Sequence, residues 1–220
     1  MNYFIVIAGV ILVIAVYFLY VYLTNDNLSS GILELKTGKI VEASKLKSPG
    51  STIFSYQFWV FMANPATAEK PIIKRAASDG TTNFNITLDK SALKIKDGNT
   101  ELFTATNNFP IQQWTCVVVN YNESNKIAEC YINGKLVYTK QLTNSIRVVP
   151  SQNLVIGDNG LNGYITKVVY LPETLTSDKV WSEYLSGNGQ LSISSYFAGY
   201  NLNMSIAKDD VVQRNWKLFS

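Results

Sequence analysis

The chain has 220 residues, of which 47% are hydrophobic and 16% are charged, with a formal net charge of +3. Its charges are spread along the chain, without the basic cluster that typically binds nucleic acid. There is no histidine, which excludes Ser/His and Cys/His nucleophile pairs and every metal site that needs histidine. Two cysteines are too few for a cysteine-only zinc site or a disulfide scaffold. We therefore expect no nucleic-acid partner and no histidine-based catalysis.

Phe4–Leu23 is a stretch of 20 residues without a charge. A helix of this length spans about 30 Å, the thickness of a bilayer core, and tyrosines near both ends suit the membrane interface. A cleaved signal peptide would have a basic start and a small-residue cleavage site, which this stretch lacks, and a buried core helix is the other alternative. We predict a single-pass membrane anchor over residues 1–23, with the bilayer as the partner of residues 4–23.

The polar residues 24–30 (TNDNLSS) are predicted to be a linker. No lysine or arginine precedes the anchor, whereas Lys36 and Lys39 follow it closely. The positive-inside rule then favours a cytoplasmic C-terminal domain, but two lysines leave the side of the membrane open.

Short apolar-alternating runs separated by turn residues predict an all-β domain over residues 31–190. Ile32–Glu42 holds two short pieces around Gly38, which we expect to form an edge hairpin. Thr52–Met62 alternates strictly, and this predicts a strand with one apolar face made by Phe54, Tyr56, Phe58, Val60 and Met62. Other strands are expected at 71–77, 84–88, 93–96, 101–106, 153–156 and 164–171.

The centre of the chain predicts three consecutive antiparallel strands, Trp114–Tyr121, Ile127–Ile132 and Lys135–Leu142. Asn133-Gly134 separates the last two and favours a type I′ turn, which needs positive φ at both central residues. Residues 176–185 then predict a helix with Val180, Trp181, Tyr184 and Leu185 on one face. Residues 191–220 carry further apolar runs, and we expect this C-terminal extension to pack on the sandwich or on a partner.

The order of these motifs resembles the laminin-G-like, or concanavalin A-like, lectin/glucanase jelly-roll domain over residues 48–187. The most specific part is a Trp followed by a Val-rich strand and then Tyr-x-Asn-Gly, here QQWTCVVVNYN and CYINGKLV. Around it, FSYQFWVFM, PIIKRA, FNITLDKSALKIKDGN, GYITKVVYLPETLT and DKVWSEYL stand in the family's order. The resemblance implies a two-sheet antiparallel jelly-roll sandwich and a lectin-like binding function.

The sequence departs from the family where catalysis would take place. The family's Trp is commonly followed by His, but Thr115 and Cys116 stand here, and Thr166 replaces a common Asp. Catalytic members carry acids in the pattern E-x-D-x-x-E, whereas no two acids here are two residues apart. One strand therefore cannot present such an acid pair on one face, so we predict that the chain is not an enzyme and disfavour glycoside hydrolysis.

Calcium is an optional cofactor that the family resemblance leaves open. Asp79, Asp158 and Asn159 stand in loop-like segments, where carboxylates and carbonyls can bind calcium. Loop acids beside glycine also form turns, so we assign no metal ligand. No ligand-binding residue can be assigned either.

Cys116 and Cys130 lie on the first two central strands. If the turn between these strands is centred on Glu123, the cysteines lie directly opposite each other and can form a disulfide. With any other turn centre they separate, and buried free thiols are the alternative. A disulfide would indicate an oxidising compartment or a viral thiol-oxidase route.

Two functional hypotheses follow. The first is a membrane-anchored, non-catalytic lectin-like binding or adhesion module whose sandwich binds a glycan or a protein. The second is a structural minor capsid or membrane protein of a large DNA virus, located in the virion membrane and linking it to the protein shell. A seven-residue linker spans at most about 25 Å, which holds the domain close to the bilayer and favours the second hypothesis.

Overall fold

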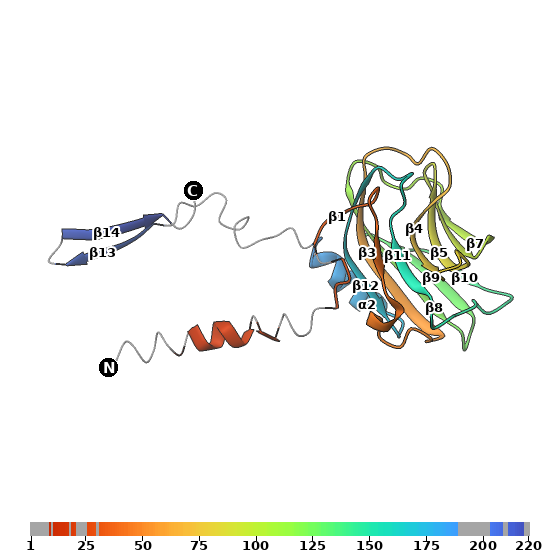
Figure 1. Cartoon of the computed structure of the whole chain (residues 1–220), viewed down its shortest axis with the longest axis horizontal. Coiled ribbons are helices and arrows are strands. Elements are labelled where there is room, and N and C mark those ends of the chain that lie inside the picture. The colour runs from red at the N-terminus through yellow and green to blue at the C-terminus, as the bar shows by residue number, and fades with distance from the viewer. Residues whose placement is uncertain are drawn as a thin grey trace.

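The computed structural model describes residues 9, 11–17, 19, 20, 26–29 and 31–188, and the backbone of 203–208 and 211–217. Two six-stranded antiparallel sheets pack against each other to form a sandwich (Figure 1). This confirms the predicted all-β, two-sheet architecture.

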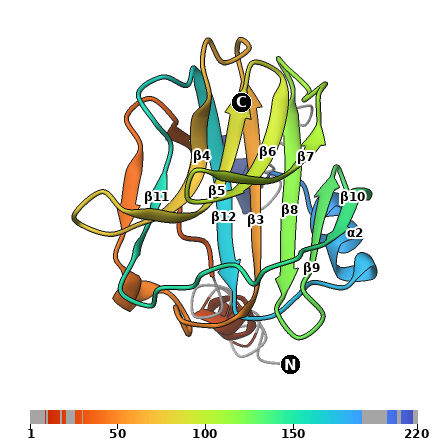
Figure 2. The ribbon, with the colours of Figure 1, turned by 90° about the vertical axis from the view of Figure 1, so that its right-hand side faces the viewer.

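The two sheets are named A and B. Sheet A has the order β1 (Leu33–Glu34), β12 (Gly163–Leu171), β3 (Ile53–Met62), β8 (Trp114–Asn122), β9 (Ile127–Ile132) and β10 (Lys135–Gln141). Sheet B has the order β2 (Lys39–Val41), β11 (Asn153–Ile156), β4 (Lys70–Ala76), β5 (Thr82–Asp89), β6 (Ala92–Asp97) and β7 (Thr100–Thr106). A short 3-10 helix, η1 (Ala43–Lys45), follows β2. Figure 2 looks onto sheet B, with sheet A behind it.

The hairpin predicted over Ile32–Glu42 is wrong, because its two strands belong to different sheets. β1 pairs with β12 in sheet A, whereas β2 pairs with β11 in sheet B. Between them Leu35 is fully buried, and its N–H donates to the oxygen of Gly163 at 2.9 Å. Burying Leu35 in the core carries the chain from one sheet to the other instead of turning it back.

The alternating face predicted for β3 lies in the core. Phe54, Tyr56, Phe58, Val60 and Met62 are all buried between the sheets. Phe54 contacts Tyr56 edge-on with ring centroids 5.5 Å apart, a favourable geometry for aromatic pairs. The residues between them in sequence therefore point to the outer face of sheet A.

The three central strands form the predicted meander, β8-β9-β10. Asn133 and Gly134 have φ values of 51° and 77°, which confirms positive φ at both turn positions. The Asn133 Oδ1 accepts a hydrogen bond from the N–H of Cys116 at 2.9 Å, so the turn is also fixed to β8.

Both cysteines are free and buried. The turn between β8 and β9 has four residues, with Asn122 opposite Ile127, so it is not centred on Glu123. Cys130 therefore lies opposite Val119 and faces the core, while Cys116 faces the other side of the sheet. This register is the physical reason that no disulfide joins them.

Helix α2 (Ser177–Leu185) confirms the predicted helix and covers part of the outer face of sheet A. Val180 is fully buried, and Tyr184 stacks on Trp59 with ring centroids 5.7 Å apart. Trp181 and Leu185 remain exposed, so only part of the predicted apolar face is buried.

Part of the predicted anchor, 4–23, lies outside the described residues. Residues 9, 11–17, 19 and 20 are helical, and the large apolar side chains among them are 49–69% exposed. Within the described part of the chain, no helix is long and apolar enough to cross a membrane.

The segment predicted as a linker is fixed to the sandwich where the structure describes it, over residues 26–29. The N–H of Leu28 donates to the oxygen of Val168 at 2.7 Å, and Ser29 is fully buried. Asp26 pairs with Lys47 at 2.7 Å. The other residues of the predicted linker, 24, 25 and 30, lie outside the described residues.

The C-terminal extension contains an antiparallel pair of strands, β13 (Asn203–Lys208) and β14 (Val211–Lys217), which form a sheet of their own. The rest of residues 191–220 lies outside the described part of the chain. Packing of this extension on the sandwich or on a partner stays a prediction.

Candidate ligand-binding surface

The outer face of sheet B carries polar side chains in two rows that cross the strands. On β5, Phe84, Ile86 and Leu88 point into the core, so Asn85 and Thr87 point outward. Asn85 lies between Lys74 on β4 and Lys96 on β6, and Lys96 lies opposite Glu101 on β7. In the second row, Thr87 lies opposite Lys94. We call Lys74, Asn85, Thr87, Lys94, Lys96 and Glu101 the polar face.

Charges of both signs alternate on the polar face. The Lys94 Nζ is 3.0 Å from the Asp89 Oδ2, 3.5 Å from the Glu101 Oε2 and 3.6 Å from the Glu69 Oε2. Glu69 also pairs with Lys96. The hydrogen bond that the Lys94 ammonium donates to Asp89 raises the pKa of Lys94, and the one that the Thr104 hydroxyl donates to Glu101 lowers the pKa of Glu101. Both groups are therefore charged at neutral pH.

Two buried oxygens on the polar face lack a hydrogen-bond donor among the described residues: Asn85 Oδ1 and Thr87 Oγ1. Asn85 is 7% exposed and Thr87 is 4% exposed. The Asn85 Nδ2 donates to the oxygen of Gly98 at 2.8 Å, which fixes the amide plane and commits Oδ1 to the acceptor role. Buried acceptors without a donor are unfavourable, so an external O–H group would be stabilised here once the side chains that cover these two atoms move aside.

The outer face of sheet A carries an aromatic ladder, made by Tyr164, Phe61 and Trp114. These three residues are direct cross-strand partners on β12, β3 and β8. The Phe61 ring centroid is 5.9 Å from that of Trp114 and 6.5 Å from that of Tyr164. With Ile32 they line a shallow apolar hollow of about 320 Å³.

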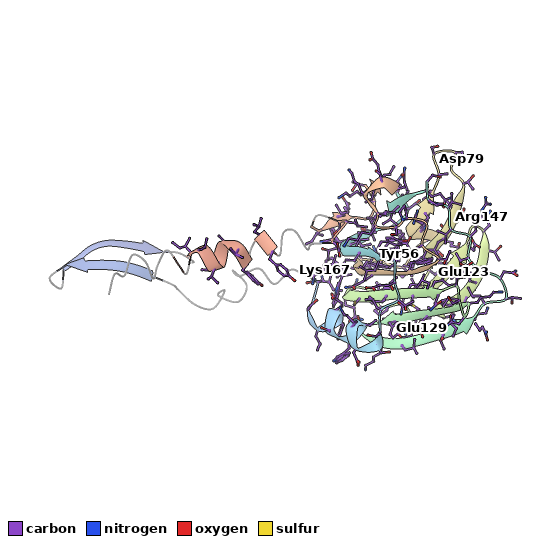
Figure 3. The ribbon with its side chains drawn as sticks, turned by 90° about the horizontal axis from the view of Figure 1, so that it is seen from below. Tyr56, Asp79, Glu123, Glu129, Arg147 and Lys167 are labelled. Atoms are coloured by element: carbon purple, nitrogen blue, oxygen red, sulfur yellow. The ribbon has the colours of Figure 1, made fainter. Side chains whose placement is uncertain are left out.

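The two ends of the sandwich domain meet on this same outer face of sheet A. Asp26 and Asn188 line one polar hollow of about 650 Å³, together with Gln57, Lys167 and Glu183. The Gln57 Nε2 donates to the Glu183 Oε2 at 3.2 Å. In Figure 3, Lys167 lies on one side of the sandwich, and Asp79 and Arg147 lie toward the opposite side. The chain therefore enters and leaves on the sheet A side, and the polar face of sheet B lies on the other side.

The positions singled out for catalysis hold no reactive group. Thr115 and Cys116 are buried, and burial raises the pKa of the Cys116 thiol to about 12. Thr166 is buried opposite Trp59. A general acid at neutral pH needs a carboxyl whose pKa is raised. The pKa of Glu101 is lowered instead, as described above.

The loop acids considered for calcium act as turn formers. The N–H of Thr81 donates to the Asp79 Oδ1 at 2.8 Å, which lowers the pKa of Asp79. Burial alone would raise the pKa of Asp158. The hydrogen bond from the N–H of Gly160 and the nearby Lys70 ammonium outweigh this effect, so the pKa of Asp158 is lowered. Among the residues that the structure describes, no three His, Cys, Asp or Glu side chains gather to hold a metal ion.

The polar face was missed by sequence reasoning. Its signal is the alternation of Asn85 and Thr87 with core residues, and of Lys94 and Lys96 with Leu93 and Ile95. Alternation gives the face of each strand, but only the register across four strands places these side chains together.

Residues 36–181, about two thirds of the chain, match the concanavalin A-like lectin/glucanases superfamily. The chain belongs to this superfamily. The predicted family resemblance is thus confirmed, and the matched residues include strands of both sheets of the sandwich. No curated protein matches the sequence.

Solved structures share the fold of this concanavalin A-like chain. The receptor binding domain of botulinum neurotoxin C/D mosaic serotype aligns with a TM-score of 0.59 and 15% identity, over 72% of this chain and 43% of that one. Trypanosoma rangeli sialidase in complex with the inhibitor DANA aligns with a TM-score of 0.52 and 12% identity, over 69% of this chain and 26% of that one. The chain thus spans less than half of either structure, and these identities show the fold alone.

Proposed function

We propose that this chain is a single-pass, membrane-anchored, non-catalytic lectin-like module that binds a neutral carbohydrate on the polar face of sheet B. The observation that carries the proposal is the pair of buried oxygens, Asn85 Oδ1 and Thr87 Oγ1, which lack a donor and lie between lysine and carboxylate groups. They lie on sheet B, whereas Asp26 and Asn188, at the two ends of the sandwich domain, lie on the outer face of sheet A.

The chemistry of the polar face suits sugar hydroxyls. A hydroxyl both donates and accepts hydrogen bonds, and the face offers ammonium donors next to carboxylate acceptors. Lys70, Lys74, Lys94 and Lys96 are matched in number by Glu69, Asp89, Glu101 and Asp158 around the face. Because these charges balance, the face favours a neutral hydroxyl-rich ligand over a sulfated polyanion.

The anchor is supported by sequence and by local structure. Phe4–Leu23 carries no charge over 20 residues, and its described residues are helical with exposed apolar side chains. An apolar helix that is exposed on all sides is favourable in lipid and unfavourable in water. A membrane location follows from this part of the proposal.

A non-catalytic role is supported by the state of the carboxyl groups. The pKa values of Asp79, Glu101 and Asp158 are all lowered, which keeps these groups ionised at neutral pH. The acids of the polar face are also engaged by lysines, so none is placed as a proton donor to a glycosidic oxygen.

The structural hypothesis, a protein that links a virion membrane to a protein shell, is the second candidate. The close attachment of residues 26–29 to the sandwich favours it, because this leaves very little chain between anchor and domain. If it holds, the purified chain binds a shell protein and no glycan.

The test uses the whole chain in lipid nanodiscs on an array that carries neutral, sialylated and sulfated glycans, with empty nanodiscs as the control. We expect binding to neutral glycans that survives 0.5 M salt, about the condition at which exposed charge pairs are screened. Binding to no glycan, or only salt-sensitive binding to sulfated ones, contradicts the proposal. Retention of the chain in vesicles after alkaline carbonate extraction tests the anchor separately.

A further inference from the structure

The aromatic ladder is an exposed apolar surface of the sandwich. Tyr164 is 47% exposed and Ile32 is 50% exposed, and Phe61 and Trp114 are half-buried between them. Helix α2 covers the neighbouring part of the same face, where it packs on Trp59. The ladder is therefore one part of the outer face of sheet A that α2 leaves uncovered.

The chain reaches the sandwich beside this ladder. Asp26 and Gly31 line the polar hollow, and the next residue, Ile32, lines the apolar hollow with the ladder. Thr166 lies in the polar hollow two residues along β12 from Tyr164, so the two hollows are neighbours on the same face. The ladder thus lies beside the site of chain entry.

The attachment of residues 26–29 makes the tether to the proposed anchor very short. Asp26 is already held by Lys47, and Leu28 by Val168. Only three residue steps separate Asp26 from Leu23, the last residue of the predicted span, which is at most about 11 Å of extended chain. The face on which the chain enters is therefore held at the bilayer surface.

We infer that the aromatic ladder and Ile32 rest in the interfacial layer of the lipid bilayer that holds the proposed anchor. This inference rests on the anchor in the proposed function. Trp and Tyr are the residues that favour the lipid interface, because their rings are apolar and their N–H or O–H groups bind water and headgroups. The contact turns the polar face of sheet B toward the aqueous phase, where a ligand can reach it.

The test places a spin label at the ladder and a second label far from it. Ile32→Cys and Tyr164→Cys report on the ladder, and Asp79→Cys on the exposed remote loop is the control. The native thiols do not compete for the label, because Cys116 and Cys130 are buried. Each whole-chain variant is reconstituted in phosphatidylcholine vesicles, and its collision rates with oxygen and with a water-soluble nickel chelate are measured.

We expect labels at 32 and 164 to collide more with oxygen and less with nickel, as a label at lipid depth does, while the label at 79 is accessible to nickel. Equal nickel access at all three positions, in chain that resists carbonate extraction, overturns the ladder contact but not the anchor. Extraction of the chain by carbonate overturns both. Spin–spin broadening of the label at 32 would identify a second copy of the chain as the occupant of the ladder. Protection from nickel only after glycan is added would identify a glycan as the occupant. Either result also overturns the inference.

Discussion

The side chains of Cys116 and Cys130 lie on adjacent strands of sheet A and point to opposite faces of it. Cys116 packs under α2 in the cluster that contains Trp59, and Cys130 packs in the core of the sandwich opposite Val119. The β8–β9 turn decides this arrangement, since a shift in its centre would bring the two thiols together.

The thiols should be almost inert in the folded chain. Burial raises the pKa of Cys116 and of Cys130 to about 12, from an ordinary value of 9.0. The thiolate fraction at pH 8 is then about a thousandfold lower than for an ordinary thiol, and reaction with a thiol reagent should slow at least in that proportion. Two thiols should react at once when urea unfolds the chain. Prompt reaction of both thiols in the native chain, or reaction of neither thiol after unfolding, would contradict this prediction.

Substitution of Gly134 should lower the free energy of unfolding more than substitution of a glycine with a similar φ value. Gly134 and Gly80 have φ values of 77° and 84°, but a Cβ at Gly134 would lie 2.6 Å from the Trp181 Cε3, while one at Gly80 meets nothing within 4 Å. Gly80→Ala should therefore cost about 1 kcal/mol from strain, and Gly134→Ala should cost more and displace Trp181. Equal changes in the free energy of unfolding would show that α2 does not pack on this turn.

Arg75 should be a major contributor to stability although it is not paired with an acid in the described structure. Its buried guanidinium donates to the oxygen of Gln152 at 3.1 Å and to those of Pro49 and Val149 at 3.3 Å. Arg75→Met leaves the carbonyls of Gln152 and Pro49 without this donor, while that of Val149 keeps the N–H of Gln152, and it should lower the free energy of unfolding by about 3 kcal/mol or more. Arg147→Met, at an exposed arginine, is the control and should change it by about 0.5 kcal/mol or less. Similar urea midpoints for the two variants would contradict this assignment.

The charge network of the polar face should stabilise the fold only within a window of pH. The pKa of Glu101 is lowered from 4.5, so its contribution is present above that value and is lost as pH falls through the folded pKa. The pKa of Lys94 is raised from 10.5, so its contribution is present below that value and is lost at higher pH. The difference in unfolding free energy between wild type and Glu101→Gln should therefore be present at pH 7 and smaller at pH 3.

Urea unfolding at the two pH values measures this difference, with Glu34→Gln on the exposed edge strand β1 as the control. A Glu101→Gln effect that is equal at pH 7 and pH 3 would mean that the carboxylate charge contributes nothing.

Strand positions could be predicted from alternation and turn residues, and Ile127–Ile132 and Asn153–Ile156 match the structure at both ends. The partners of β1 and β2 could not be predicted, because the separation of these two strands depends on where Leu35 is buried. The cysteine geometry depends on a turn length that alternation does not give. The polar face likewise needs the register of Asn85 with Lys74 and Lys96, which is a tertiary property.

The central claim is that the polar face of sheet B binds the carbohydrate while the face of sheet A lies on the membrane. Its most direct test measures the affinity of a neutral glycan found on the array for nanodisc-held chain. Lys74→Ala/Lys96→Ala should weaken binding at least about tenfold, roughly 1.4 kcal/mol. Lys45→Ala/Lys135→Ala, which removes the same charge elsewhere, and Trp114→Ala on the ladder should each leave affinity within about twofold. Loss of binding in Trp114→Ala with full binding in Lys74→Ala/Lys96→Ala would place the ligand on sheet A and contradict the account.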